Sequence, residues 1–373
     1  MVATILQYIF IFLVLILSAF LGAIEKHLNF SINLKKITVL LLIIIISCSA
    51  AIRTIGTDTE NYVNIYLMLP RISNLNINLL LEMSYEPGFV LLASLLKSIG
   101  IGIQGFFFLF SFIPLVIISS VIFKVDNKNA FLLFFIFISF FILRGPLDII
   151  RQFFAMSILL KAFYDLSENN SIKYYLNSFA SILFHYSTSI TLFIRRFLER
   201  TIIRKSNYVL ISLVIFLIGV IARNFILSDI SRPTVTFPAL NKVVSYLSSS
   251  YQYDNTIHFI SRILLEHSLP WINIGLIIFL TSYSYIIQLN RINLISFNSM
   301  LVGSYIYFFC MGLGESTIAV RLSYMFSIGI FILIKDLLII KPNKIKYIIW
   351  ILVIILYNLI VLNYYSNAYK LFY

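Results

Sequence analysis

The residues of this chain that could do chemistry are arginines standing beside acidic and aromatic residues at the ends of apolar stretches. The first group contains Arg53, Gly56, Asp58 and Tyr62, directly after an apolar run. Arginine carries a flat, permanently charged fork that binds two phosphate oxygens at once, whereas lysine offers a point charge. Asp58 is a carboxylate that could act as a base or bind a hydroxyl group. The group indicates an anion site beside a carboxylate or, equally, a helix cap with an Arg–Asp ion pair.

A second group joins two apolar stretches and contains Arg144, Arg151 and Gln152. Arg151 falls in the first turn of a predicted helix, where a positive charge opposes the helix dipole. Such a charge is unfavourable unless an anion lies nearby, and free N–H groups at a helix start also bind anions. This position therefore favours Arg151 as a phosphate ligand over a structural role.

Three further sites are open to two interpretations each. Glu86 precedes Pro87 at a predicted helix start, where an acid and a proline are ordinary, so a structural role is favoured. His185 lies between apolar stretches and could be a general base or a hydrogen-bonded histidine of a helical hairpin. Arg321 and Tyr324 are spaced to share a helix face and form another basic site, unless Arg321 merely extends its charge to the membrane surface.

Composition places these residues in a membrane protein. Of the 373 residues 60% are hydrophobic and 12% are charged, and the mean hydropathy is +0.97. A membrane helix needs roughly 17–25 apolar residues. Seven runs approach or reach this length: Ile5–Ile24, Ile37–Ile52, Gly105–Phe123, Asn207–Ala222, Ser268–Asn290, Ile292–Gly314 and Tyr347–Ala368. We expect an all-α polytopic membrane protein with about 10–12 transmembrane helices in a single domain over residues 1–373.

Several other classes of protein are excluded. The net charge of +13 fits basic cytoplasmic loops better than nucleic-acid binding. Cys48 and Cys310 lie in apolar runs without metal-ligand or disulfide spacing. The sequence has no Walker motif and no glycine fingerprint after a strand, so we expect neither a nucleotide cofactor nor a metal. The first run lacks a cleavage site and is predicted to be a retained helix.

Charge also predicts the orientation in the membrane. Five basic residues between Arg195 and Lys205 should be cytoplasmic. Counting spans from there places two long segments outside, residues 53–86 and 228–261. Residues 87–195 allow two interpretations. Either 87–96 and 173–194 each cross the membrane, or 87–100 is an interfacial helix and 172–196 is a hairpin broken at His185. We favour the second, because the first segment is short and a histidine within a span is rare.

In this topology the outer basic residues are mostly arginine. Eight arginines and three lysines lie outside, against five arginines and twelve lysines inside. The outer arginines are Arg53, Arg71, Arg144, Arg151, Arg223, Arg232, Arg262 and Arg321. The rule that orients membrane proteins treats lysine and arginine alike. Phosphate recognition does not, and it explains the bias.

The order and spacing of these residues resemble the EpsG-like family of Wzy-type polysaccharide polymerases. The resemblance covers roughly residues 50–325 and rests on order, since no single motif is specific. It is carried by Arg53-x-x-Gly56-x-Asp58-x-x-x-Tyr62, Glu86-Pro87-Gly88-Phe89, Arg151-Gln152-x-x-Ala155, Ala180-x-x-x-Phe184-His185-x-Ser187 and Arg321-x-x-Tyr324. The stretch from Arg144 to Asp148 departs from the plainer loop expected there.

The resemblance implies a multi-pass GT-C-like glycosyltransferase of the bacterial inner membrane that joins repeat units carried on undecaprenyl diphosphate, with a chain-length regulator as a membrane partner. We expect inverting transfer at the outer face without a metal or cofactor. Arg53, Arg151, Arg321 and Arg144 would hold the diphosphate. Asp58 is the first choice for the base and His185 the second, with support from Tyr62, Glu86, Gln152 and Tyr324. An O-antigen ligase, or a flippase for lipid-linked oligosaccharides, is the alternative.

Overall fold

The computed structural model describes residues 2–25, 27–53, 58–83, 85–200, 205–229, 267–282 and 290–340. Every regular element in these residues is helical, which confirms the all-α prediction. Four of the described helices are long and apolar enough to cross a membrane: α2 (Ile32–Ala51), α6 (Ile103–Val125), α11 (Lys205–Asp229) and α15 (Arg291–Gly312). A fifth span is present if the bent pair 318–326 and 330–336 counts as one, and shorter apolar helices accompany them.

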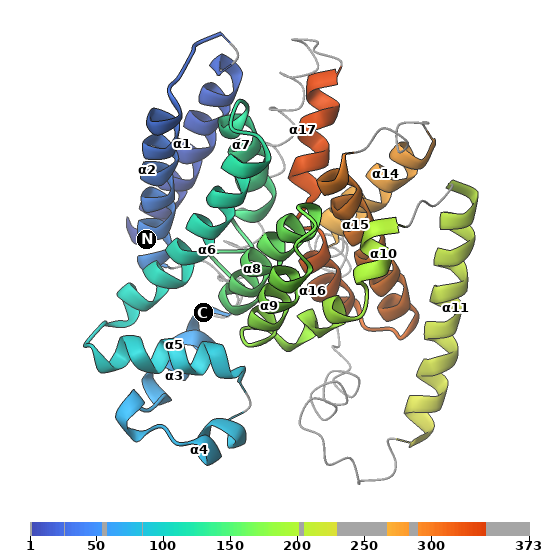
Figure 1. The fold of residues 1–373 in the computed structure, drawn as a ribbon. Coiled ribbons are helices and arrows are strands. Elements are labelled where there is room, and N and C mark those ends of the chain that lie inside the picture. The colour runs from blue at the N-terminus through green and yellow to red at the C-terminus, as the bar shows by residue number, and fades with distance from the viewer. Residues whose placement is uncertain are drawn as a thin grey trace. The chain divides into compact units, whose positions relative to one another are not determined.

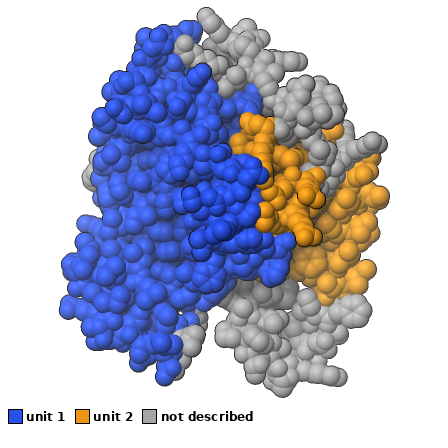
Figure 2. Space-filling model, in the orientation of Figure 1, with its two compact units in different colours: residues 1–193, 331–373 blue, residues 194–330 orange. Residues whose placement is uncertain are grey.

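Several predicted features lie wholly or partly outside the described residues: Gly56, Arg232, Arg262, the run 347–368, part of the run 268–290, and most of the outer segment 228–261. The chain divides into two compact units, residues 1–193 with 331–373, and residues 194–330 (Figure 2). Each unit is considered by itself. The division leaves the single membrane domain a prediction.

The first unit is built around long helices packed side by side. Besides α2 and α6 it contains α1 (Val2–Ile24), α7 (Ala130–Phe141), α8 (Ile150–Ser167), α9 (Ser171–Ile182) and α17 (Ile330–Ile340). In this unit α2 packs on α6, α6 on α8, α8 on α9, and α1 on α7. The short helices α3 (Thr59–Met68), α4 (Ile77–Glu82) and α5 (Pro87–Ser98) gather below α2 and α6 in Figure 1. Two 3-10 segments are η1 (Ile72–Asn74) and η2 (Tyr186–Leu192).

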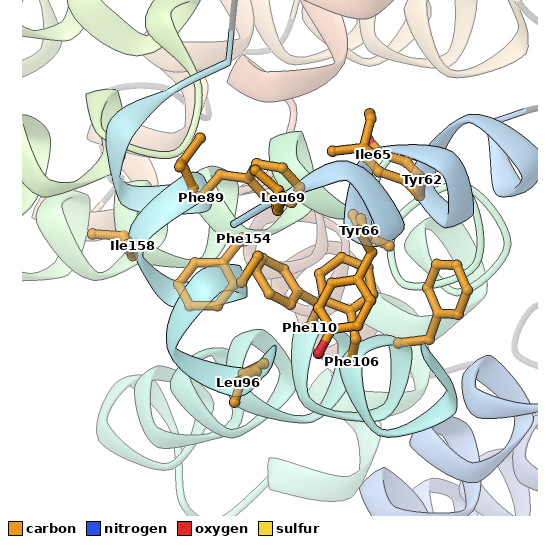
Figure 3. Packing of buried hydrophobic residues seen from close by; sticks show 14 residues of the cluster. Tyr62, Ile65, Tyr66, Leu69, Phe89, Leu96, Phe106, Phe110, Phe154 and Ile158 are labelled. Carbon is orange, nitrogen blue, oxygen red and sulfur yellow. The ribbon is translucent and has the colours of Figure 1, made fainter. Parts of the chain in front are cut away.

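An aromatic core fixes the short helices to the long ones. Figure 3 shows side chains of α3, α5, α6 and α8 meeting there. Tyr66 of α3 stacks on Phe106 of α6 with ring centres 4.5 Å apart, and Phe89 of α5 lies edge-on to Phe110 at 5.4 Å. Phe154 of α8 stacks at 4.0 Å on Phe184, which follows α9. Such ring pairs stabilise the fold beyond the burial of their apolar surface. They therefore hold residues 85–89 and 183–186 against the long helices.

Two features of residues 87–195 match the interpretation favoured above. Helix α5 has 12 residues, a length of about 18 Å, which is short for a hydrocarbon core of about 30 Å. The chain after α9 breaks at residues 183–185 before η2 begins. The side of the membrane on which these residues lie stays a prediction.

Four charged residues connect helix ends of the first unit near the start of α2. We term them the lysine cluster: Glu25, Lys35, Asp126 and Lys335. Lys35 Nζ donates to Glu25 Oε1 at 2.5 Å and to the carbonyls of residues 127 and 128 at 3.1 and 2.8 Å. Glu25 Oε2 accepts from the N–H groups of Phe131 and Leu132 at 3.0 and 3.2 Å, near the start of α7. Lys335 of α17 donates to Asp126 at 3.1 Å. The cluster therefore ties α1, α2, α7 and α17 together.

The second unit contains α10 (Arg195–Arg200), α11, α14 (Ser268–Ser282), α15 and α16 (Ser316–Phe326). Helices α11 and α15 approach each other at Gly219 and Gly312, whose Cα atoms would each lie 3.1 Å from a Cβ added to the other. Only residues without a side chain permit this crossing. Asn298 of α15 donates to the carbonyl of Leu198 at 2.8 Å, which fixes α10 on α15.

Candidate functional site

The centre of the candidate site is the carboxylate of Glu86. Its Oε2 accepts a hydrogen bond from Arg151 Nη1 at 2.5 Å, and its Oε1 lies 3.1 Å from His185 Nδ1. Glu86 stands at the start of α5, as the sequence predicted, but its side chain makes no capping hydrogen bond. Glu86 therefore stands at a helix start as predicted, and its carboxylate also pairs with two distant side chains, so its role in the site stays a prediction. Its partners come from the start of α8 and from the break after α9.

A glycine makes this meeting of three segments possible. The N–H of Gly88 donates to the carbonyl of Leu183 at 2.8 Å, so the first turn of α5 touches the end of α9. A Cβ on Gly88 would lie 2.8 Å from that carbonyl oxygen and 2.9 Å from the Leu183 Cβ, closer than real contacts allow. Glu86 lies two residues before Gly88, and His185 lies two residues after Leu183. The backbone contact therefore brings the two side chains together.

The backbone at His185 is held by hydroxyl groups. Its carbonyl accepts from Thr188 Oγ1 at 2.8 Å, and that hydroxyl accepts from Ser181 Oγ at 3.0 Å. Its N–H donates to the Ser181 carbonyl at 3.0 Å. These hydrogen bonds connect the residues before and after the helix break. They therefore fix the backbone position from which the imidazole of His185 extends. The side chain of His185 is 25% exposed.

Arg151 lies in the first turn of α8 inside a wall of rings. Its guanidinium is 5.8, 5.3 and 5.4 Å from the ring centres of Tyr62, Tyr85 and Phe89. Such distances are those of cation–π contacts, which favour arginine. The charge of Arg151 opposes the dipole of α8, and the anion that compensates it in this structure is Glu86. The side chain retains 16% exposure.

The electrostatics of the site keep Glu86 ionised. Burial alone would raise its pKa, but the hydrogen bond with His185 and the charge of Arg151 lower the pKa from 4.5 to about 2. An ionised carboxylate only accepts hydrogen bonds. The His185 nitrogen that faces it must therefore carry the hydrogen, so Nδ1 is the donor.

The side chain of Arg53 is fully buried, and its hydrogen bonds connect the start of α3 to the loop before α8. Its Nε donates to Thr59 Oγ1 at 2.6 Å and its Nη2 to the carbonyl of Asp148 at 2.7 Å. The guanidinium lies 4.9 Å from the ring of Phe107 and 5.7 Å from that of Tyr62. The side chain has no exposed surface, so in this structure Arg53 has no face to offer to a diphosphate.

Asp148 is a residue that the sequence analysis did not select. Besides accepting from Arg53, it accepts from the N–H of Asp58 at 3.3 Å through its carboxylate. It thereby ties the loop before α8 to the start of α3. The available signal was a lone carboxylate in the stretch between Arg144 and Arg151 that departed from the family pattern. Asp58 is half-buried at the start of α3, and its side chain makes no capping hydrogen bond.

The remaining predicted residues fall into two places. Tyr62 is buried with its ring near both Arg53 and Arg151. Gln152 is buried next to Arg151, and Arg144 is half-buried in the loop after α7. Arg321 and Tyr324 belong to α16 of the second unit, where Arg321 is exposed and Tyr324 is buried. No group of three or more His, Cys, Asp or Glu side chains among the described residues could hold a metal ion.

Comparison with known proteins adds one finding. The model of a family described as the EpsG family matches residues 36–373, a range that contains every residue of the candidate site. No curated protein and no solved structure matches the chain.

Proposed function

Since the chain belongs to the EpsG family, we propose that it is a membrane glycosyltransferase that polymerises repeat units carried on undecaprenyl diphosphate. Family membership and several apolar helices long enough to span a bilayer support a role in exopolysaccharide synthesis within the membrane. The polymerase reaction is the finer proposal. A substrate with a prenyl tail and a diphosphate group requires an enzyme with cationic groups at the membrane surface.

The observation that carries the proposal is the meeting of an arginine, a carboxylate and a histidine from three segments. Arg151 and His185 keep part of the cluster accessible, since their side chains are 16% and 25% exposed. Glycosyl transfer from a diphosphate needs one group that stabilises the leaving anion and one that takes a proton. The guanidinium of Arg151 and the imidazole of His185 can fill these two roles.

In the proposed reaction a sugar hydroxyl of one lipid-linked unit attacks the anomeric carbon of the growing chain. The bond from that carbon to the diphosphate oxygen breaks, and the lipid diphosphate leaves with the electron pair. The hydroxyl proton passes to a protein base, and the configuration at the anomeric carbon inverts. Arg151 stabilises the leaving diphosphate, a kind of contact worth about 2.7–4 kcal/mol for one donor. Arg144 is proposed as a further ligand, and the role of Arg321, a residue of the second unit, stays a prediction. Arg53 is assigned a positioning role, because its guanidinium is enclosed.

The test uses full-length protein in detergent with lipid-linked repeat units as the sole substrate. We expect a ladder of lengthened glycans and free undecaprenyl diphosphate, and Arg151→Ala should abolish both. If no ladder forms with the units alone, and glycan is transferred only after lipid A core is added, the protein is a ligase. A protein that makes no bond in detergent but moves lipid-linked units across a vesicle membrane would be a flippase.

A further inference from the structure

One carboxylate holds two groups with different tasks in the proposed reaction. The Oε2 atom of Glu86 contacts Arg151 at 2.5 Å, and the Oε1 atom contacts His185 at 3.1 Å. The side chain of Glu86 is 7% exposed, so water offers it little competition as a partner. A buried carboxylate with two such neighbours fixes the orientation of both.

The contact settles which nitrogen of His185 can act as a base. Because Glu86 only accepts hydrogen bonds, Nδ1 of a neutral His185 carries the hydrogen and Nε2 carries the lone pair. A carboxylate that holds an imidazole in this form also stabilises the cation that arises when Nε2 takes a proton. Asp58 is placed differently: it stands at the start of α3, and its backbone N–H donates to the carboxylate of Asp148 at 3.3 Å.

Among the described residues few charged or titratable groups surround this pair, and one of them is Tyr85, which adjoins Glu86 and whose ring lies 5.3 Å from the guanidinium of Arg151. Arg151 approaches from α8, and Tyr62 and Asp58 from α3. Tyr186 adjoins His185 and is 51% exposed. Arg151 balances the charge of Glu86. The proton of an attacking hydroxyl therefore has one neutral nitrogen base in this group, Nε2 of His185.

We propose that His185 is the base of the transfer and that Glu86 is the positioning residue that holds it in the form with a free Nε2. The proposal rests on the proposed function. The acceptor O–H bond breaks as oxygen bonds to the anomeric carbon, Nε2 takes the proton, and the lipid diphosphate departs with the electron pair. The resulting imidazolium is stabilised by Glu86, while Arg151 serves the leaving group.

Glu86→Gln separates this role from simple structural support. A glutamine matches the size of glutamate and can still accept from Arg151, but its amide group would donate toward Nδ1. His185 would then carry its hydrogen on Nε2, the wrong nitrogen for a base. Glu60→Gln is the matched control, because Glu60 is an exposed glutamate in the first turn of α3.

We expect Glu86→Gln and His185→Ala each to lower the initial rate of polymerisation roughly 10²–10⁴-fold. The double variant should be no slower than His185→Ala, because the two residues act as one unit. Imidazole added to His185→Ala should restore part of the rate. Glu60→Gln should keep the native rate.

A spectroscopic readout tests the same assignment without substrate. Nitrogen-15 NMR of labelled protein in lipid nanodiscs should show His185 with its hydrogen on Nδ1, and on Nε2 in Glu86→Gln. An unchanged hydrogen position in Glu86→Gln would overturn the positioning role, as would a native rate. Full activity of His185→Ala would overturn the base. If the wild type makes no polymer from lipid-linked units, the proposed function fails instead, while the NMR result still tests the Glu86–His185 link.

Discussion

Among its described residues the first unit contains two clusters of charge, and they differ in what surrounds the carboxylate. The lysine cluster lies at the start of α2, where Lys35 is in the first turn. The other, which we term the arginine cluster (Arg53, Glu86, Arg151 and His185), lies beyond its end, since Arg53 follows α2. Sixteen helical steps lead from Lys35 to Ala51, the last residue of α2, a distance of about 24 Å, and Arg53 follows two residues later. The two clusters therefore lie at opposite ends of one membrane-length helix.

In the lysine cluster the partners are mostly backbone. Glu25 accepts two N–H groups near the start of α7, and Lys35 donates to two carbonyls of the turn before it. Such partners cannot leave without unfolding the helix start. In the arginine cluster the partners of Glu86 are the side chains of Arg151 and His185, which are partly exposed. A carboxylate bound by backbone N–H groups stabilises the fold, whereas one bound to partly exposed side chains can orient groups that meet a substrate.

The two carboxylates, both outside the membrane-spanning helices, also differ in acidity. Burial raises the pKa of Glu25, and the bonds from Lys35 and from α7 offset only part of it. The pKa of Glu86 is lowered to about 2 despite burial, because His185 and Arg151 both favour the charged form. Glu86 is therefore a permanent anion at physiological pH, as an orienting group must be.

The largest expected difference between the clusters is the side of the membrane that each faces. We expect a cysteine at exposed Asn74, in the outer segment with the arginine cluster, to react fully with an impermeant thiol reagent on intact spheroplasts. A cysteine at exposed Asn127, beside the lysine cluster, should react only after permeabilisation. Cys48 and Cys310 are replaced by alanine as background. Labelling of both positions from outside would contradict the predicted topology.

Exchanging the cation should matter for catalysis at the arginine cluster alone. Arg151→Lys loses the second donor group and the flat surface that meets Tyr62, Tyr85 and Phe89. We expect its rate to fall about 10²-fold or more, close to Arg151→Ala, at normal protein level. Polymerisation by purified enzyme measures this. If lysine restores full-length chains, Arg151 supplies charge and not a bidentate contact.

Removing the cation of the lysine cluster should affect stability and leave catalysis intact. Lys35→Ala leaves the buried Glu25 charge without its ion-pair partner. Breaking a buried pair in this way costs about 3–5 kcal/mol. We expect a lower melting temperature in detergent, and a native rate per folded molecule below that temperature. A selective loss of rate in folded protein would mean that the lysine cluster takes part in turnover.

Lowering the pH should change stability in opposite directions through the two carboxylates, Glu86 and Glu25. A pKa lowered from 4.5 to about 2 gives Glu86 roughly 3 kcal/mol of stabilisation, present above pH 4.5 and lost as the pH falls toward 2. Glu25, whose pKa is raised, gains from protonation and so acts in the opposite direction. Melting temperatures measured across this range should fall in the wild type and in Glu25→Gln. In Glu86→Gln most of that fall should disappear.

The sequence predicted the kind of fold and singled out all four residues of the arginine cluster, but it did not predict their pairing. Long apolar runs imply helices because no other open structure satisfies its backbone in lipid. The pairing of Glu86 with Arg151 and His185 joins positions 65 and 99 residues apart. It depends on the contact of Gly88 with Leu183, and local spacing carries no sign of that contact.

Two further residues show where local patterns stop being informative. The sequence leaves Arg53 equally open to an anion site and to an Arg–Asp ion pair, and the family resemblance favours the first, yet tertiary packing encloses it between Phe107, Tyr62 and the Asp148 carbonyl. Asp148 looked like a departure from a family pattern and proved to connect two segments of the site. Burial of a charged group depends on which distant residues complete its hydrogen bonds, and a single sequence does not specify these.

The first unit takes α17 from a part of the chain made after the whole second unit. Phe331 of α17 lies edge-on to Phe137 with ring centres 5.5 Å apart, and Lys335 bonds to Asp126, more than 200 positions earlier. During translation α1 to α9 are therefore made before α17, and their packing stays incomplete while the ribosome adds residues 194–330. A stop codon placed just before α17 would spare every residue of the arginine cluster and still leave its unit unfinished.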